Sequence, residues 1–147
     1  MVYLALYKGN AKNWKKRLVD KAIKIATHSK YSHCELAIDD SNSKMQCYSA
    51  SLRDGGVRTK RIYLHDGKWD LVSIPDANAE QIKRFYASTK GAEYDIAGAL
   101  GIVLGIAHSK RRYFCSEWIA ASLGFANPEK YSPETLAKEI LIKYKND

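Results

Sequence analysis

Short apolar stretches separated by polar turn residues dominate the first half of the sequence and limit the folds open to it. They are rich in aliphatic and aromatic residues and are too short for most helices. Asp, Asn, Ser and Gly residues of the kind that form turns separate most of them. The pattern predicts strands at the following ranges: Val2–Tyr7, His33–Ile38, Lys44–Ser51, Val57–Leu64 and Trp69–Ile74.

Other segments show apolar residues at intervals of three and four, which predicts amphipathic helices. Turn and capping residues set the expected ends. Asp76 or Asn78 caps one helix, which Gly91 ends, and Gly124 ends the helix that starts at Cys115. We expect residues 141–144 to form a short strand. The tract Gly98–Ala107 is apolar all round, and it fits either a buried helix or a lid over a pocket. The predicted helices are Asn13–His28, Ile82–Thr89, Cys115–Leu123 and Ser132–Ile140.

The composition fits a single domain, 1–147. With 147 residues, of which 46% are apolar, the chain supplies one hydrophobic core. Of the formal charge of +8, most lies in residues 1–32, which hold eight Lys or Arg and one acid. Three cysteines without CxxC spacing argue against a disulfide framework and a structural zinc site. We therefore expect a reducing compartment.

His33 and Glu35 are the first candidates for chemistry. Side chains two apart on a strand share a face, so this pair projects together while Cys34 points the other way. A carboxylate that accepts from one ring nitrogen raises the basicity of the other, as a histidine base requires. Any alternating strand also produces such pairs, so a polar face without catalytic function is the alternative.

Cys115 is the second candidate. A thiol in the first turn of a helix lies at the positive end of the helix dipole, which favours the thiolate, and N–H groups there can hold an oxyanion. A small buried apolar residue is the alternative interpretation. We interpret Cys34 and Cys47 as packing residues and the other histidines as surface residues.

The segments YSHCELAI, GAEYDIAG and RYFCSEWIAASLGF occur in that order. In this they resemble the circularly permuted branch of the NlpC-type papain-like superfamily, which includes YiiX-like proteins and, more distantly, lecithin retinol acyltransferase. The histidine strand precedes the cysteine helix in that branch, as it does here. The resemblance extends from Tyr3 to about Leu136. Cys34 departs from the pattern, because an aliphatic residue is usual between the histidine and the acid.

The resemblance implies an α+β, circularly permuted papain-like fold, with an antiparallel sheet or partial barrel packed against helices. It implies that Cys115 is the nucleophile, His33 the general base and Glu35 the residue that orients the histidine. Tyr94 corresponds to a tyrosine near the oxyanion site, although packing in the core explains it equally well. The implied activity is thiol-dependent cleavage of an amide bond in a cell-wall peptide or γ-glutamyl-type substrate, through an acyl-enzyme and without a metal or organic cofactor.

Two other functions stay open. A lipid acyl hydrolase or acyltransferase of the same fold would use the apolar tract 98–107 as an acyl pocket. A non-catalytic module would bind an anionic polymer through the basic helix Lys12–Lys24, whose charges a solvated helix face also explains. No pattern for specific nucleic-acid binding is present. Without a signal peptide or a stretch of the roughly 20 apolar residues that span a membrane, we expect a cytoplasmic bacterial or phage protein.

Overall fold

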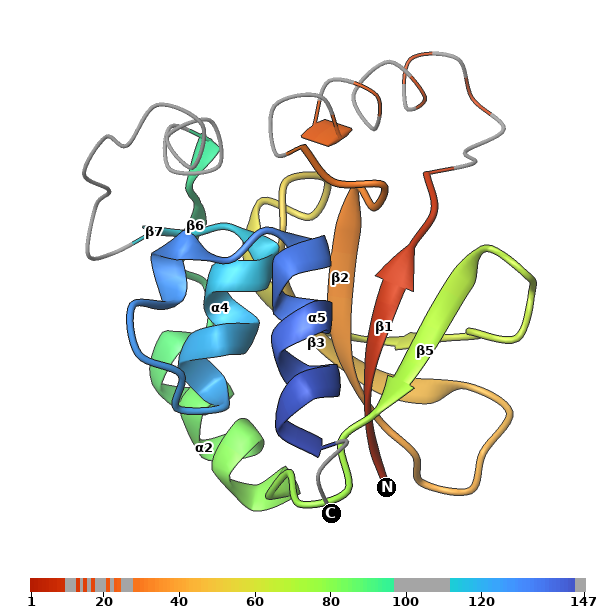
Figure 1. Ribbon diagram of the computed structural model, residues 1–147, viewed down its shortest axis with the longest axis vertical. Coiled ribbons are helices and arrows are strands. Elements are labelled where there is room, and N and C mark those ends of the chain that lie inside the picture. Colours follow the sequence, from red (N-terminus) through yellow and green to blue (C-terminus); the bar gives the residue numbers. More distant parts are fainter. Residues whose placement is uncertain are drawn as a thin grey trace.

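The computed structural model describes residues 1–9, 13, 15, 17, 21, 23–24, 28–96 and 112–144. The chain is α+β: an antiparallel sheet is covered on one face by helices (Figure 1). The predicted helix 13–28 lies for most of its length outside the described residues, and the apolar tract 98–107 lies wholly outside them. Within the described ranges, no helix is both long and apolar enough to cross a membrane.

Five strands form the sheet, in the order β4-β3-β2-β1-β5, and each neighbouring pair is antiparallel. The strongly apolar strands β1 and β2 lie inside the sheet, where each is flanked on both sides by another strand, as β3 also is. The predicted antiparallel sheet is confirmed, and β4 and β5 form its two edges. The strand bounds are β1 Val2–Tyr7, β2 His33–Ile38, β3 Met45–Ser51, β4 Gly56–Ile62 and β5 Trp69–Ser73.

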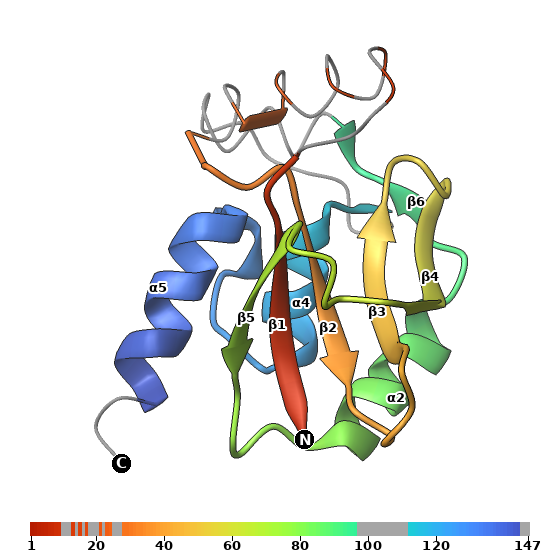
Figure 2. The ribbon, with the colours of Figure 1, turned by 90° about the vertical axis from the view of Figure 1, so that its right-hand side faces the viewer.

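The helices pack together on one side of the sheet (Figure 2). Asn78 caps α2 by accepting from the N–H groups of Glu80 and Gln81, as its position predicts. The predicted strand at 141–144 is wrong, because α5 continues through Tyr144 with Ile140 buried in the core. The bounds are α2 Ala79–Thr89, α4 Cys115–Ser122, a 3₁₀ turn Pro128–Lys130 and α5 Pro133–Tyr144; β6 Glu93–Tyr94 and β7 Arg112–Tyr113 form a short parallel pair.

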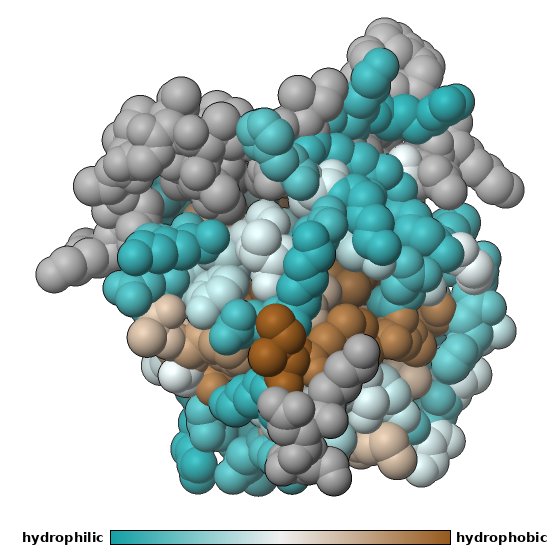
Figure 3. Space-filling model, viewed as in Figure 1, coloured by the Kyte–Doolittle hydropathy of each residue, from teal (hydrophilic) through white to brown (hydrophobic). Residues whose placement is uncertain are grey.

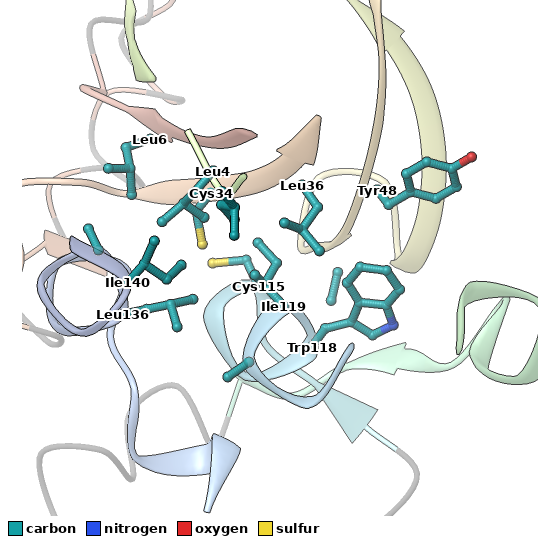
Figure 4. Packing of buried hydrophobic residues seen from close by; sticks show 14 of the residues in the cluster. Leu4, Leu6, Cys34, Leu36, Tyr48, Cys115, Trp118, Ile119, Leu136 and Ile140 are labelled. Atoms are coloured by element: carbon teal, nitrogen blue, oxygen red, sulfur yellow. The ribbon is translucent and has the colours of Figure 1, made fainter. Parts of the chain in front are cut away.

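Alternation along the strands divides the buried side chains between the two faces of the sheet. Leu4, Leu36 and Cys34 lie in the larger cluster, where they pack against Trp118 and Ile119 of α4 (Figure 4). A smaller cluster on the opposite face contains Ala5, Ala37, Met45, Cys47 and Leu64. Not every apolar residue is covered: on the face seen in Figure 3, apolar surface gathers near the end of α5, where Ile142 is exposed.

Gly56 allows the loop before β6 to approach β4. The Val57 N–H donates to the Ala92 carbonyl at 2.8 Å, and the Gly91 N–H donates to the Val57 carbonyl at 3.1 Å. Gly56 has a φ of 142°, and a Cβ atom there would lie 2.0 Å from the Ala92 oxygen. The lack of a side chain at Gly56 is therefore needed to hold Tyr94, which follows this loop, against the sheet.

We expect Gly56→Ala to destabilise the protein by about 1–3 kcal/mol more than Gly55→Ala does, because the added methyl group collides with backbone. Gly55 is the matched control: its φ is also positive, at 82°, but a Cβ atom there meets nothing within 4 Å. Urea unfolding of both variants measures the difference. Equal loss of stability in the two variants would contradict a steric requirement at Gly56.

Candidate active site

His33 and Glu35 lie at the beginning of β2 and face the same side of the sheet, as predicted. The distance between His33 Nε2 and Glu35 Oε1 is 2.7 Å, so the ring nitrogen donates to the carboxylate. Glu35 is fully buried, whereas the His33 side chain is 20% exposed. With Nε2 engaged by Glu35, Nδ1 is the ring nitrogen left to exchange a proton with another group.

Arg58 on β4 holds the other side of the Glu35 carboxylate. Its Nη1 donates to Glu35 Oε2 at 2.7 Å and its Nη2 donates to Oε1 at 2.5 Å, which is a bidentate pair. Arg58 Nε donates to Asp54 Oδ2 at 2.7 Å. Ser49 on β3 is paired with Arg58 in the register and is small and buried. We infer that this small residue lets the arginine side chain cross β3 to reach β2.

This arrangement keeps both His33 and Glu35 charged inside the protein. Burial raises the pKa of the Glu35 carboxyl, but the charge of His33 and the hydrogen bonds from Arg58 outweigh burial and hold the pKa below its usual value. Burial likewise disfavours the imidazolium, yet Glu35 and a bond to Cys115 raise the pKa of His33 to about 9. The pair is therefore an imidazolium and a carboxylate at neutral pH.

Cys115 is the first residue of α4. Phe114, which precedes it, is extended, with φ of −93° and ψ of 169°, and its N–H donates to Glu117 Oε2 at 3.3 Å. Side chains of the following residues fix the helix: Ser116 Oγ donates to the Tyr131 carbonyl at 2.6 Å. Trp118 Nε1 donates to Thr89 Oγ1 of α2 at 2.9 Å. The thiol is thus placed at the positive end of an anchored helix.

The Cys115 thiol interacts through its side chain with both Cys34 and His33. The hydrogen bond from the Cys34 thiol lowers the pKa of Cys115 most; burial opposes this, and the bond to His33 and its positive charge lower the pKa further. The net effect places the pKa of Cys115 well below that of an ordinary thiol. The lowered pKa of Cys115 and the raised pKa of His33 together favour a thiolate–imidazolium pair.

A groove of about 480 Å³ opens beside these residues. His33, Glu35 and Tyr94 line it, and Tyr7 and Trp69 form an aromatic pair in its wall with ring centroids 5.0 Å apart. Burial raises the pKa of Tyr94, and the nearby negative charge of Cys115 raises it further, so the phenol keeps its proton. Cys115 itself is 3% exposed, so a substrate carbonyl reaches the sulfur only if neighbouring side chains move.

The structure brings the predicted site residues together. Cys115 interacts with His33, and His33 with Glu35. Tyr94 lines the same groove, close enough for the charge of Cys115 to raise its pKa. Sequence reasoning missed Arg58, because its reach to Glu35 depends on the pairing of three strands. It also missed the contact between Cys34 and Cys115. Cys34 is buried in the core, as expected for a packing residue, but its thiol is a direct partner of the candidate nucleophile.

Glu117, in the first turn of α4, is a second buried carboxyl. Burial raises its pKa to about 8, the bond from Phe114 opposes this, and the nearby Asp95 and Glu129 raise it further. The folded state therefore holds a proton that the unfolded state, with a carboxyl pKa near 4.5, releases. It follows that this residue stabilises the fold less as the pH rises from about 4.5 to about 8.

We expect Glu117→Gln to remove that part of the pH dependence, because the amide cannot ionise. The free energy of unfolding of the wild type, measured in urea between pH 5 and 8.5, then falls more steeply with pH than that of the variant. Glu139→Gln, at an exposed position on α5, is the control and keeps the wild-type slope. Parallel slopes for the wild type and Glu117→Gln would contradict a buried, protonated Glu117.

Among the described residues, no group of three or more His, Cys, Asp or Glu side chains is arranged to hold a metal ion. No known protein-family model matches the chain, and no curated protein matches it significantly.

Proposed function

We propose that this protein is a thiol-dependent hydrolase that cleaves an amide bond through an acyl-enzyme on Cys115. The observation that carries the proposal is a chain of three side chains, one at the start of α4 and two on β2. The Cys115 thiol interacts with His33, and Glu35 accepts from Nε2 of that histidine at 2.7 Å. A low-pKa thiolate with an oriented acid and base supplies the groups that acyl transfer needs.

In the proposed reaction, the Cys115 thiolate attacks the carbonyl carbon and the carbonyl oxygen becomes an oxyanion. N–H groups in the first turn of α4 and the Tyr94 hydroxyl donate to that oxygen. The carbon–nitrogen bond breaks as the His33 imidazolium gives its proton to the leaving amine. The neutral histidine then takes a proton from water, which attacks the thioester and releases the acid and the thiolate.

We further propose that the fold is the permuted papain-like one that the sequence motifs resemble. The order along the chain supports this: His33 on a strand comes first and Cys115 at a helix start comes last. The helix packs against the sheet that carries the histidine. The substrates we propose on this resemblance are cell-wall peptides or γ-glutamyl-type amides.

Selective alkylation tests the proposal. Iodoacetamide at neutral pH is expected to modify Cys115 much faster than Cys34 or Cys47. Burial raises the pKa of Cys34 well above normal and that of Cys47 to about 12, so neither forms a thiolate readily. Trypsin separates the three thiols into the peptides 31–44, 45–53 and 113–130, which mass spectrometry quantifies. Equal modification of the three peptides would overturn the proposal.

The alternatives rest on other segments. A lipid acyl hydrolase or acyltransferase draws on the tract 98–107, and an anionic-polymer module on the basic segment Lys12–Lys24; these lie wholly or largely outside the described residues. Salt distinguishes the second alternative, because binding to an anionic polymer weakens as ionic strength rises. If the protein is an amidase, we expect the rate at which iodoacetamide alkylates Cys115 to be nearly independent of salt, because the Cys115 thiol, which pairs with His33, is buried.

A further inference from the structure

Cys34 and Cys115 point their sulfur atoms toward one another across the interface between β2 and α4 (Figure 4). Both side chains belong to the larger core cluster, and both cysteines are free. Cys34 lies between His33 and Glu35 on β2, and both of those side chains face the opposite side of the sheet. The position between the two polar residues therefore places a second thiol directly against the candidate nucleophile.

The two thiols differ in reactivity, although they are partners. The lowered pKa of Cys115 favours its thiolate form, and the hydrogen bond from the Cys34 thiol is the largest cause of that lowering. Burial raises the pKa of Cys34, and the negative charge of Cys115 raises it further, so Cys34 stays protonated while Cys115 is ionised. Oxidants attack thiolates in preference to thiols, so Cys115 is the cysteine that reacts first.

We propose that Cys34 is the resolving cysteine of a reversible oxidation site, which joins Cys115 in a disulfide when hydrogen peroxide is present. The Cys115 thiolate attacks one peroxide oxygen, the O–O bond breaks, and hydroxide leaves; Cys115 becomes a sulfenic acid. The Cys34 sulfur then attacks the Cys115 sulfur, the S–O bond breaks, and hydroxide leaves with the Cys34 proton as water. In total, one thiolate and one thiol lose two electrons and one proton, and one peroxide becomes one water and one hydroxide.

The geometry favours this resolution step. The two sulfur atoms already face one another across the interface between β2 and α4 (Figure 4), so they need only approach to about 2 Å to form the bond. The proposal rests on the ionised Cys115 of the proposed function, but it does not require that Cys115 cleaves amides. A disulfide here would remove the thiolate, protect it from irreversible oxidation and stop the proposed reaction until a dithiol reduces it.

Cys47 supplies an internal control. It lies in the smaller cluster, on the opposite face of the sheet from the Cys34–Cys115 pair, and its sulfur is 3.6 Å from the Met45 carbonyl oxygen. The sheet therefore separates it from the sulfenic acid. Cys47→Ala should leave the formation of the disulfide unchanged, whereas Cys34→Ala should abolish it.

The experiment treats the full chain with a small excess of hydrogen peroxide, blocks free thiols with iodoacetamide and maps the tryptic peptides by mass. We expect a linked species joining peptides 31–44 and 113–130, with peptide 45–53 alkylated. Dithiothreitol should restore the alkylation of Cys115 in the wild type and in Cys47→Ala. In Cys34→Ala, Cys115 should instead accumulate as the sulfinic acid, which dithiothreitol does not reduce.

Two results would overturn the proposal, and both are measured on the wild-type protein, so neither depends on whether a variant folds. One is sulfinic Cys115 in the wild type with Cys34 still free to alkylate, and the other is a disulfide that contains Cys47. Failure of the proposed function gives a different pattern. A disulfide between Cys34 and Cys115 without acylation of Cys115 by an activated ester would support the redox site and contradict the hydrolase.

Discussion

Arg58→Met is expected to destabilise the protein by about 3–5 kcal/mol at neutral pH, because it removes one of the two cationic partners of the buried Glu35 carboxylate. Glu35 is completely buried, and Arg58 provides two of the hydrogen bonds to its oxygens. His33 alone then remains to balance the carboxylate. Urea unfolding at pH 7 measures the loss.

A second substitution separates the charge effect from loss of packing. If the unpaired carboxylate causes the instability, Glu35→Gln in the Arg58→Met background restores part of the stability. Asp54→Asn is the control, because Asp54 is the other carboxylate that Arg58 binds. Asp54 accepts from Arg58 Nε but is 30% exposed, so we expect a smaller loss of unfolding free energy. An Arg58→Met protein as stable as the wild type, or one that Glu35→Gln weakens further, would contradict this account.

His33→Ala is expected to lower the rate of acyl transfer by about 10²–10⁴-fold, because it removes the proton donor for the leaving group and the base for water. It also removes the positive charge that helps to hold the pKa of Cys115 down. The rate of hydrolysis of p-nitrophenyl acetate, an activated ester, measures the effect. His65→Ala, at an exposed histidine, is the control and keeps the wild-type rate.

Glu35→Gln is expected to give an intermediate rate, because the amide oxygen still accepts from His33 Nε2 but no longer stabilises the imidazolium. The wild-type pKa of His33, raised to about 9, should fall in this variant. NMR titration of the ring follows that change. An unchanged ester rate in His33→Ala would remove His33 from the proposed mechanism.

Local sequence pattern was sufficient for the parts of the site that lie close together in the chain. The two-residue spacing of His33 and Glu35 on a strand placed both on one face, and the helix after Phe114 placed Cys115 in its first turn. The strand and helix periodicities predicted the elements, whereas the α+β class and the antiparallel sheet, which the structure has, were implied by the resemblance. The strand predicted at 141–144 was wrong because the sequence has no signal that ends the helix before it. Between Glu134 and Tyr144 there is no glycine or proline, so α5 continues.

The parts that escaped prediction depend on contacts between distant segments. Arg58 binds Glu35 across the intervening strand, where its register partner is the small residue Ser49. The sequence of a single strand does not reveal which residues of other strands lie beside it. Cys34 faces away from Glu35, as alternation requires. The face of the sheet to which Cys34 points is the one against which α4 packs. The thiol of Cys115 therefore interacts with side chains of two consecutive β2 residues, His33 and Cys34.

Trapping an acyl-enzyme tests the central claim most directly. The chain is mixed with p-nitrophenyl acetate, quenched in acid within seconds and digested, and the peptide 113–130 is examined by mass spectrometry with and without hydroxylamine, which cleaves thioesters. We expect an acetyl group on Cys115 that hydroxylamine removes and that His33→Ala greatly reduces. Acetylation confined to lysines, or equal among Cys34, Cys47 and Cys115, would contradict it.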